Sequence, residues 1–247
     1  DQRVENLVRR KCILDVRDFP DSPYRDCFVK DFGVIESDPE VDIVVETIGG
    51  ATVALDFTTR ALKAGKSVVS SNKELVATHG YELLQLAREH GVSYLFEASV
   101  GGGIPILRPL TSCLAANELS QVTGILNGTT NYILSRMDAE GADYADVLAD
   151  AQAKGYAEAD PSADVDGFDA ASKTAILASI GFGTRVTTDD VYQQGIRTIG
   201  AEDIAQAREL GYTIKLLGIA RNTEAGVDVR VHPTLIPADH MLSLIHI

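Results

Sequence analysis

The densest charged segment of the 247-residue chain places a lysine four residues after an aspartate. Asp169 and Lys173 would share one face of a helix, where side chains four residues apart are neighbours. The residues around Lys173 are mostly small or apolar, which predicts that this helix is packed on several sides. A packed lysine beside a carboxylate is an acid–base candidate, because burial favours the neutral amine while the carboxylate favours the ammonium.

Two other interpretations of this segment stay open. An exposed Asp169–Lys173 ion pair would stabilise the helix by only about a few tenths of a kcal/mol and would carry no chemistry. The second alternative is a calcium-binding loop of the EF-hand type. The aspartates of the segment 160–169 lack the regular spacing of that loop and its final glutamate, which counts against the second alternative.

Two further loops follow predicted strands and could bind a cofactor. Loop 46–50 carries Thr47 and ends on two glycines, which allow a ligand to approach the backbone closely. Loop 70–73 ends on Lys73, which would project over the same crevice of the sheet. The competing interpretations are a plain tight turn for the first loop and a surface lysine at a helix start for the second. A cation at a helix N-terminus is slightly disfavoured, which favours a functional lysine.

The segment 97–105 places a carboxylate after an apolar strand and then three consecutive glycines. Such a run exposes backbone carbonyl groups. Carbonyl oxygens and one carboxylate are hard ligands, which suit a monovalent or hard divalent cation rather than zinc. The alternative is a flexible hinge between two domains.

The elements that must position these residues alternate between strand and helix. Apolar runs predict buried parallel strands, and periodic segments between them predict helices. The predicted strands are 12–17, 41–47, 67–70 and 93–96, and the helices are 51–64 and 80–90. This alternation predicts an α/β fold with part of a Rossmann-type doubly wound sheet.

The pattern changes near residue 119, where helices become more frequent. Strands are predicted at 122–126, 216–220 and 227–232, with helices starting at 130 and 144 and helical segments dominating up to Gly218. We therefore expect residues 1–105 to form a partial dinucleotide-binding domain. Residues 106–247 would form an α+β second domain with a mixed sheet.

A G-x-G-x-x-G turn, which normally opens a dinucleotide-binding sheet, is absent from the sequence. Residues 3–10 are typical of the end of a helix, so the chain is expected to begin inside the first crossover helix. Residues 241–247 follow no clear pattern, which suggests a truncated second domain. We accordingly expect the sequence to be a fragment.

Composition excludes several classes of function. The net charge of −14, without a basic stripe, argues against nucleic-acid binding. No apolar stretch reaches the roughly 20 residues of a membrane helix, and the first ten residues lack a signal-peptide core, so a cytoplasmic location is expected. Cys12, Cys27 and Cys113 are odd in number and far apart, which predicts reduced thiols and no zinc site.

Taken together, these segments resemble homoserine dehydrogenases. The resemblance follows the family's order through 46–50, 71–73, 97–105, 124–132 and 155–173. It implies NAD- or NADP-dependent interconversion of L-aspartate 4-semialdehyde and L-homoserine, on the route to threonine and methionine. It also implies that residues 106–247 form the catalytic substrate-binding and dimerisation domain, and that the protein is a homodimer or homotetramer.

The resemblance assigns roles residue by residue. It implies Lys173 as the proton donor and Lys73 as a second active-site lysine. The substrate-binding positions would be Glu158, Asp169, Asp164 and Thr129. The cofactor-binding positions would be Thr47, Gly49, Gly50, Ser71, Asn72, Lys73 and Gly155. A sodium ion would be held by Glu97 and by the carbonyl groups of Val100, Gly102 and Ile104.

Three questions stay open beside this resemblance. The glycine-rich turn is missing, so an inactive fragment or a non-catalytic binding protein on the same fold is the runner-up. Arg17 could meet the 2′-phosphate of NADP, whereas the adjacent Asp18 favours NAD. Another semialdehyde dehydrogenase is a third option, although no cysteine lies beside a suitable histidine for the acylating type.

Overall fold

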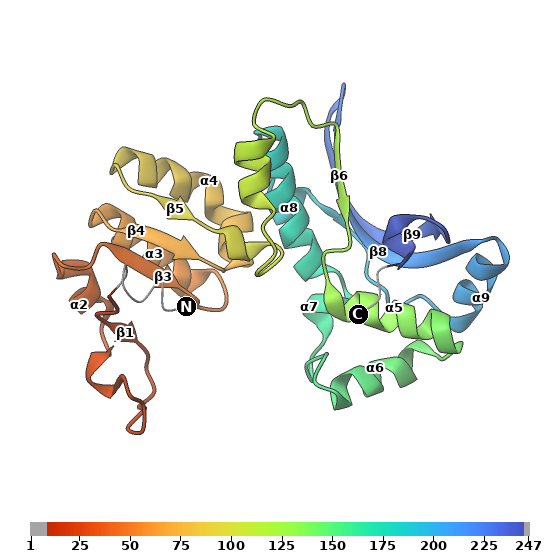
Figure 1. Cartoon of the computed structure of the whole chain (residues 1–247), viewed down its shortest axis with the longest axis horizontal. Coiled ribbons are helices and arrows are strands. Elements are labelled where there is room, and N and C mark those ends of the chain that lie inside the picture. The colour runs from red at the N-terminus through yellow and green to blue at the C-terminus, as the bar shows by residue number, and fades with distance from the viewer. Residues whose placement is uncertain (1–8, 245–247) are drawn as a thin grey trace. The chain divides into compact units, whose positions relative to one another are not determined.

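The computed structural model describes residues 9–244 (Figure 1). The chain divides into two compact units, Asp1–Leu75 with His79–Phe96, and Val76–Thr78 with Glu97–Ile247. The main break between the two units lies between Phe96 and Glu97, and the domain boundary after Pro105 stays a prediction. The helix end predicted over 3–10 lies almost entirely outside the described residues.

The first unit is built on parallel strands joined by helices, as the alternating pattern predicts. One two-stranded sheet pairs β1 (Ile13–Leu14) with β2 (Phe28–Val29), and α2 (Phe32–Ser37) follows. A second sheet has the order β3-β4-β5, with every pair parallel. Its elements are β3 (Ile43–Glu46), α3 (Thr52–Lys63), β4 (Ser67–Ser70), α4 (Lys73–Glu89) and β5 (Tyr94–Leu95).

Only one face of the three-stranded sheet is buried within the described chain. Val68 and Tyr94 are paired neighbours on the covered face and are 0% and 4% exposed. On the opposite face, Val45, Val69 and Leu95 are 68%, 38% and 59% exposed. The prediction of a buried parallel strand at 41–47 therefore holds for its place in a parallel sheet but not for its burial, because Val45 lies on the uncovered face. A continuous apolar run does not reveal whether helices cover one face of a sheet or both.

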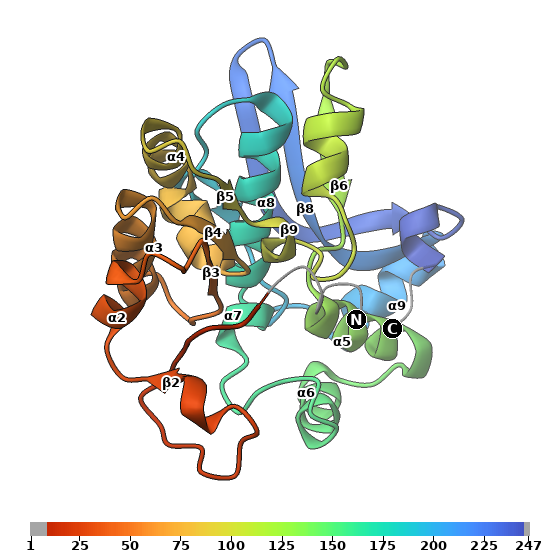
Figure 2. The same cartoon turned by 60° about the vertical axis from the view of Figure 1, so that its left-hand side comes forward.

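The second unit is an α+β domain around a mixed sheet with the order β6-β8-β9-β7, of which Figure 2 labels β6, β8 and β9. Only the β7–β9 pair is parallel. Its strands are β6 (Gln121–Gly124), β7 (Tyr192–Gln193), β8 (Tyr212–Thr223) and β9 (Gly226–Pro237). Its helices are α5 (Gly128–Glu140), α6 (Tyr144–Ala153), α7 (Ser162–Val165), α8 (Phe168–Phe182) and α9 (Ala201–Glu209).

Short helical turns complete both units. They are Arg25–Cys27, Glu97–Ser99, Pro109–Cys113, Thr188–Asp190 and Met241–Leu244. The two strands predicted at 216–220 and 227–232 are confirmed, but both are longer, because they form one hairpin of twelve paired residues per strand. Helices consequently do not dominate up to Gly218, since β8 begins six residues earlier, at Tyr212.

Helix α8 packs directly on strand β8, and this contact fixes the helix that carries Lys173. A side chain at Gly218 would place its Cβ 2.3 Å from the hydroxyl oxygen of Thr174 on α8, so only glycine permits the approach. Most of α8 from Asp169 to Ala178 is buried, which confirms the prediction of a helix packed on several sides. The framework of the sheet thus sets the position of the lysine.

Strand β8 also holds helix α5 through a buried lysine. The Nζ atom of Lys215 donates to Oδ1 of Asn131 at 2.9 Å and to Oγ of Ser135 at 2.7 Å. Lys215 is 1% exposed, and burial lowers the pKa of its ammonium group. Both helices that contribute to the candidate site are therefore anchored on the same strand.

Within residues 9–244, no helix combines the length and apolar character needed to cross a membrane. Over the same residues, no group of three or more histidine, cysteine, aspartate or glutamate side chains could hold a metal ion. The three cysteines are free; Cys12 and Cys27 are half-buried, and Cys113 is exposed.

Candidate active site

A partly buried ion pair on α8 is the centre of the candidate site in the second unit. The Nζ atom of Lys173 lies 2.7 Å from Oδ2 of Asp169, one turn earlier on the helix. The side chain of Lys173 is 20% exposed, and that of Asp169 only 4%. The alternative of a fully exposed surface pair is therefore wrong. The lysine ammonium also donates to the backbone carbonyl of Leu126 at 2.9 Å.

Asn127 joins this ion pair to a second carboxylate. Its Nδ2 donates to Oδ1 of Asp164 at 2.6 Å and to Oδ2 of Asp169 at 2.9 Å. Its Oδ1 accepts from the backbone N–H of Thr130 at 2.8 Å and so caps the N-terminus of α5. Asn127 is not among the site residues predicted from the sequence, although an asparagine just before a helical pattern is a recognisable N-cap signal.

The segment after α6 is tied to the same helix start. Thr129 donates from its hydroxyl to the backbone carbonyl of Tyr156 at 3.0 Å. Gly155 adopts a φ of +75° directly after the helix, a left-handed conformation that favours glycine. Glu158 lies two residues beyond Tyr156 with an exposed side chain, and its backbone carbonyl accepts from Gln152.

The remaining aspartates of the segment 160–169 point to other partners. Asp160 accepts from the backbone N–H and hydroxyl of Ser162, and these bonds lower the pKa of its carboxyl group. Asp166 forms a two-pronged ion pair with Arg197, with one contact at 3.0 Å. Because the four carboxylates do not converge, the EF-hand alternative has no structural support here.

In the first unit, Asn72 fixes the two loops at the carboxyl edge of the parallel sheet. Its Nδ2 donates to the carbonyl groups of Ile48 at 2.8 Å and Gly50 at 2.7 Å. Its Oδ1 accepts from the backbone N–H of Leu75 and caps α4. Both donors of the Asn72 amide are thus used within the chain, so this side chain holds the shape of loop 47–50.

Buried polar groups support these loops from below. Glu46 is 4% exposed and accepts from the Ser70 hydroxyl at 2.5 Å and from the Ile48 N–H at 2.6 Å. Burial, together with the negative charge of Glu46, raises the pKa of the nearby Tyr94 phenol. Buried hydrogen bonds to Glu46 therefore hold the loops that are predicted to bind a cofactor.

The other predicted cofactor residues lie around the same edge. A Cβ atom at Gly49 or Gly50 would meet nothing within 4 Å, so this loop borders open space that a ligand could enter. Thr47 and Ser71 are exposed, and Lys73 is the half-buried first residue of α4. Arg17 is engaged with Asp15, whose carboxyl pKa its hydrogen bonds lower to about 2, and Asp18 pairs with Lys30 at 2.8 Å.

Glu97, predicted as a cation ligand, caps the start of the following helical segment. Its carboxylate accepts from the backbone N–H groups of Ile106 at 2.7 Å, Leu107 at 3.0 Å and Arg108 at 2.8 Å. A carboxylate has about four lone-pair positions, so about one remains for a further ligand. Of the predicted carbonyl donors, Val100 is buried, and Ile104 is 73% exposed.

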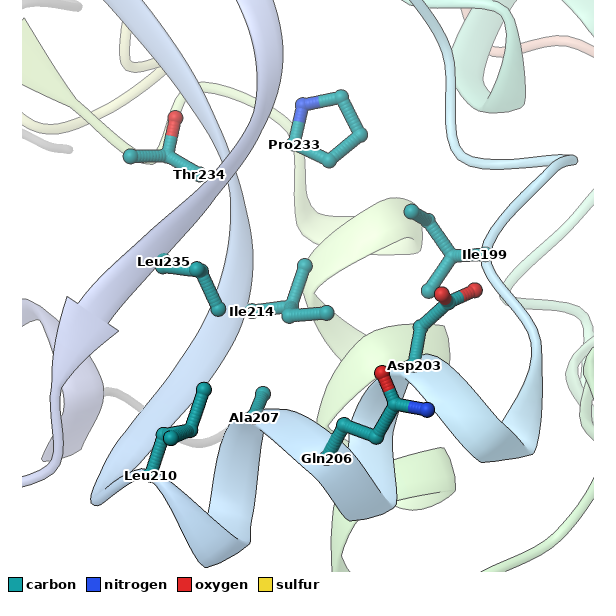
Figure 3. Close-up of a pocket in the computed structure, with 9 residues that line it drawn as sticks. All are labelled: Ile199, Asp203, Gln206, Ala207, Leu210, Ile214, Pro233, Thr234 and Leu235. Atoms are coloured by element: carbon teal, nitrogen blue, oxygen red, sulfur yellow. The ribbon is translucent and has the colours of Figure 1, made fainter.

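A pocket of about 260 Å³ lies elsewhere in the second unit, between α9 and the β8–β9 hairpin (Figure 3). Ile214 and Leu235 line it from the strands, opposite Ala207 and Leu210 of the helix (Figure 3). No residue assigned to substrate, cofactor or cation lines this pocket. Its lining is mostly apolar, and the one carboxylate in it, that of Asp203, accepts from the backbone N–H of Gly200 at 2.8 Å.

Two family models match the chain on either side of its division. The model described as homoserine dehydrogenase, NAD binding domain, matches residues 7–97. The model described as homoserine dehydrogenase matches residues 105–246. A curated homoserine dehydrogenase from Synechocystis sp. is 53% identical over 221 residues, which cover 87% of this chain and 51% of that relative. The chain spans about half the length of the curated relatives it matches.

Solved structures agree with the family models. A homoserine dehydrogenase from Thiobacillus denitrificans is 47% identical with a TM-score of 0.86, and the match covers 88% of this chain and 50% of that one. A hyperthermophilic archaeal homoserine dehydrogenase in complex with NADPH is 28% identical with a TM-score of 0.69, covering 81% and 58%. The α/β fold with a Rossmann-like unit and a mixed sheet is thereby confirmed.

Proposed function

The chain belongs to the homoserine dehydrogenase family, and from that premise we propose that it interconverts L-aspartate 4-semialdehyde and L-homoserine with NAD or NADP. The observation that carries the proposal is the partly buried Lys173–Asp169 pair, joined through Asn127 to Asp164. Two carboxylates and one ammonium leave one negative charge unbalanced. A substrate that brings its own ammonium group would balance it.

Lys173 is the proposed proton donor. When bound, the nicotinamide supplies a hydride to the aldehyde carbon of the substrate, and the carbonyl electron pair moves to oxygen. The Lys173 ammonium then protonates the developing alkoxide, which leaves an alcohol and a neutral lysine. Asp169 orients the Lys173 ammonium through the 2.7 Å contact. In the reverse direction, the neutral amine takes the proton back.

Asp164, Asp169 and Glu158 are proposed to receive the substrate's ammonium group, with Thr129 beside them. The contacts of Asn127 with both aspartates, and of Thr129 with the Tyr156 carbonyl, support this grouping. Glu158 is exposed on the segment that Thr129 anchors, where it is free to turn toward a ligand.

Thr47, Gly49, Gly50, Ser71, Asn72, Lys73 and Gly155 are proposed to bind the dinucleotide. The first six lie at the carboxyl edge of a parallel sheet, which is where α/β folds bind nucleotides. Lys73 would act there as a cation toward a carboxylate or the cofactor amide. The pairing of Arg17 with Asp15 means that a 2′-phosphate would have to compete for that guanidinium, so both NAD and NADP remain candidates.

A sodium ion is proposed at Glu97, Val100, Gly102 and Ile104. Because the Glu97 carboxylate already accepts three backbone N–H bonds, the carbonyl groups would carry most of the coordination. Exchange of sodium for choline at constant ionic strength should lower the melting temperature, while a zinc chelator should leave activity unchanged. Loss of activity on chelation that zinc alone restores would contradict this site.

We also propose a homodimer or homotetramer in the cytoplasm, acting in the synthesis of threonine and methionine. The test of the function is NADPH and NADH oxidation by the full-length protein with L-aspartate 4-semialdehyde. Butanal, an aldehyde without an ammonium group, is the matched control, because it cannot use the carboxylates. Equal rates with both aldehydes would refute the substrate assignment, and no oxidation with either would favour a non-catalytic binding protein.

A further inference from the structure

We propose that Asn127 is a positioning residue for the reaction, holding Asp164 and Asp169 together as carboxylates and keeping the Lys173 ammonium able to release its proton. The inference rests on the proposed function and adds a residue to which that function assigns no part. It is carried by the contacts of one buried side chain, which is 6% exposed.

The orientation of the Asn127 amide is fixed by its partners. Its Oδ1 accepts from the backbone N–H of Thr130 at 2.8 Å and from the Thr130 hydroxyl at 2.9 Å. A backbone N–H can only donate, so the amide oxygen must face Thr130. The NH₂ group must then face the other way, where ionised Asp164 and Asp169 can only accept. Both donors of the amide are therefore committed to the two carboxylates.

The Asn127 amide compensates the repulsion between the two carboxylates without adding a charge. Two carboxylates that share a small site repel each other, and one of them takes up a proton unless donors compensate. Asp169 is almost fully buried and therefore depends on donors from the chain. A lysine or arginine at position 127 would compensate the charge but would compete with the ammonium of the substrate. The neutral Asn127 amide donates two hydrogen bonds and leaves the negative charge of the two carboxylates available to the substrate ammonium.

Asn127 also weakens the hydrogen bond between the Asp169 carboxylate and the Lys173 ammonium, because it donates to the same oxygen. The same oxygen, Oδ2 of Asp169, accepts from Asn127 at 2.9 Å and from Lys173 at 2.7 Å. When Lys173 transfers its proton, the bond from Asn127 remains, so the buried carboxylate is not left without a donor. Removal of that bond should therefore act on the proton transfer, and so on kcat.

Two substitutions separate this role from helix capping. Aspartate and serine are both good N-cap residues, so Asn127→Asp and Asn127→Ser preserve the start of α5. Asn127→Asp removes both donors and adds a third carboxylate, which holds the Lys173 proton more tightly but attracts the substrate ammonium. We expect kcat for semialdehyde reduction to fall at least about tenfold without a rise in KM, within the range that general acid catalysis contributes. Asn127→Ser should lower kcat less and raise KM, because neither carboxylate is oriented.

The experiment uses the full-length protein, with melting temperature measured beside kcat and KM. Asn222→Asp adds the same charge at an exposed position on β8 and should leave both kinetic constants unchanged. If Asn127→Asp and Asn127→Ser fold and both keep wild-type kcat and KM, Asn127 is only a cap and the inference is wrong. If neither variant folds, Asn127 is a folding residue and the inference is equally wrong. A wild-type protein that does not reduce the semialdehyde refutes the proposed function instead, which is a distinct result.

Discussion

The ammonium of Lys173 lies 2.7 Å from the carboxylate of Asp169, in a position where Asp169 has almost no contact with solvent. The same helical spacing and the same distance occur between Arg136 and Glu140 on α5, but those side chains are 40% and 45% exposed. Burial, rather than spacing or distance, therefore distinguishes the candidate catalytic pair from an ordinary surface pair.

Lys173→Ala in the full-length protein should lower kcat far more than it raises KM. A proton donor acts mainly where the alkoxide charge develops, and general acid catalysis contributes about 10²–10⁴-fold. Steady-state kinetics of semialdehyde reduction provide the measurement, and Arg136→Ala is the matched control with normal kinetics. A folded Lys173→Ala variant with near-normal kcat would exclude Lys173 as the donor and make Lys73 the next candidate.

Glu158→Gln should weaken substrate binding, with an increase in KM larger than the decrease in kcat. A carboxylate that holds the substrate ammonium does so in the ground state and in the transition state alike, so its loss reduces binding in both. The exposed side chain makes a loss of stability above about 0.5 kcal/mol unexpected. An unchanged KM for L-homoserine and for the semialdehyde would remove Glu158 from the substrate site.

Glu97→Gln should destabilise the second unit by about 1–3 kcal/mol. Its carboxylate accepts three backbone N–H bonds, and hydrogen bonds to a charged acceptor contribute more than neutral ones. Urea unfolding followed by circular dichroism gives the free energy of unfolding. Glu118→Gln, at an exposed glutamate outside any helix or strand, is the control, and an equal effect of both substitutions would contradict the capping role.

Lys215 should make stability rise with pH. Burial lowers its pKa in the folded protein below the ordinary value of 10.5. Between the lowered value and 10.5, the unfolded chain binds more protons than the folded one, so the free energy of unfolding increases through that window. The difference in unfolding free energy between wild type and Lys215→Met should therefore grow in favour of the wild type from pH 7 toward pH 10.

Lys154→Met provides a control of opposite sign. Lys154 is exposed, and its hydrogen bond to Asp150 raises the pKa of its ammonium group. Its stabilising contribution is complete below 10.5 and is lost as the pH passes through the raised folded value. Urea unfolding at several pH values compares the two variants, and parallel pH profiles for wild type and Lys215→Met would contradict the prediction.

Patterns that depend on neighbouring residues could be predicted from the sequence. The small residues around Lys173 indicated a packed helix, and α8 is buried over most of its length. The β-α-β alternation of the first unit and the two strands of the long hairpin could be located in the same way. These features depend on periodicity and on turn residues, which the local sequence contains.

Features that depend on distant contacts could not be predicted. Asn127 donates hydrogen bonds to Asp164 and Asp169, which lie 37 and 42 residues later in the chain, and no local sequence pattern predicts these bonds. Likewise, the apolar run at 41–47 gave no sign that Val45 lies on an uncovered face of the sheet. For Glu97, the sequence indicated that its carboxylate is a hard ligand. It did not indicate that three backbone N–H groups donate to that carboxylate.

The pairing of Gln121 with Arg221 has a consequence for protein synthesis. Strand β6 joins β8 across 100 residues, and the intervening chain contains every proposed acid–base and substrate-binding residue of the second unit. A ribosome adds about 5–20 residues per second, and helices form in about a microsecond, so α5 to α8 can be helical long before β8 exists. A nascent chain that stops short of Tyr212 thus carries Asn127, Asp169 and Lys173 but lacks the strand on which α8 packs. The candidate site therefore gains the strand on which α8 packs only after β8 has been synthesised, and the high contact order of the β6–β8 pairing makes that step slow.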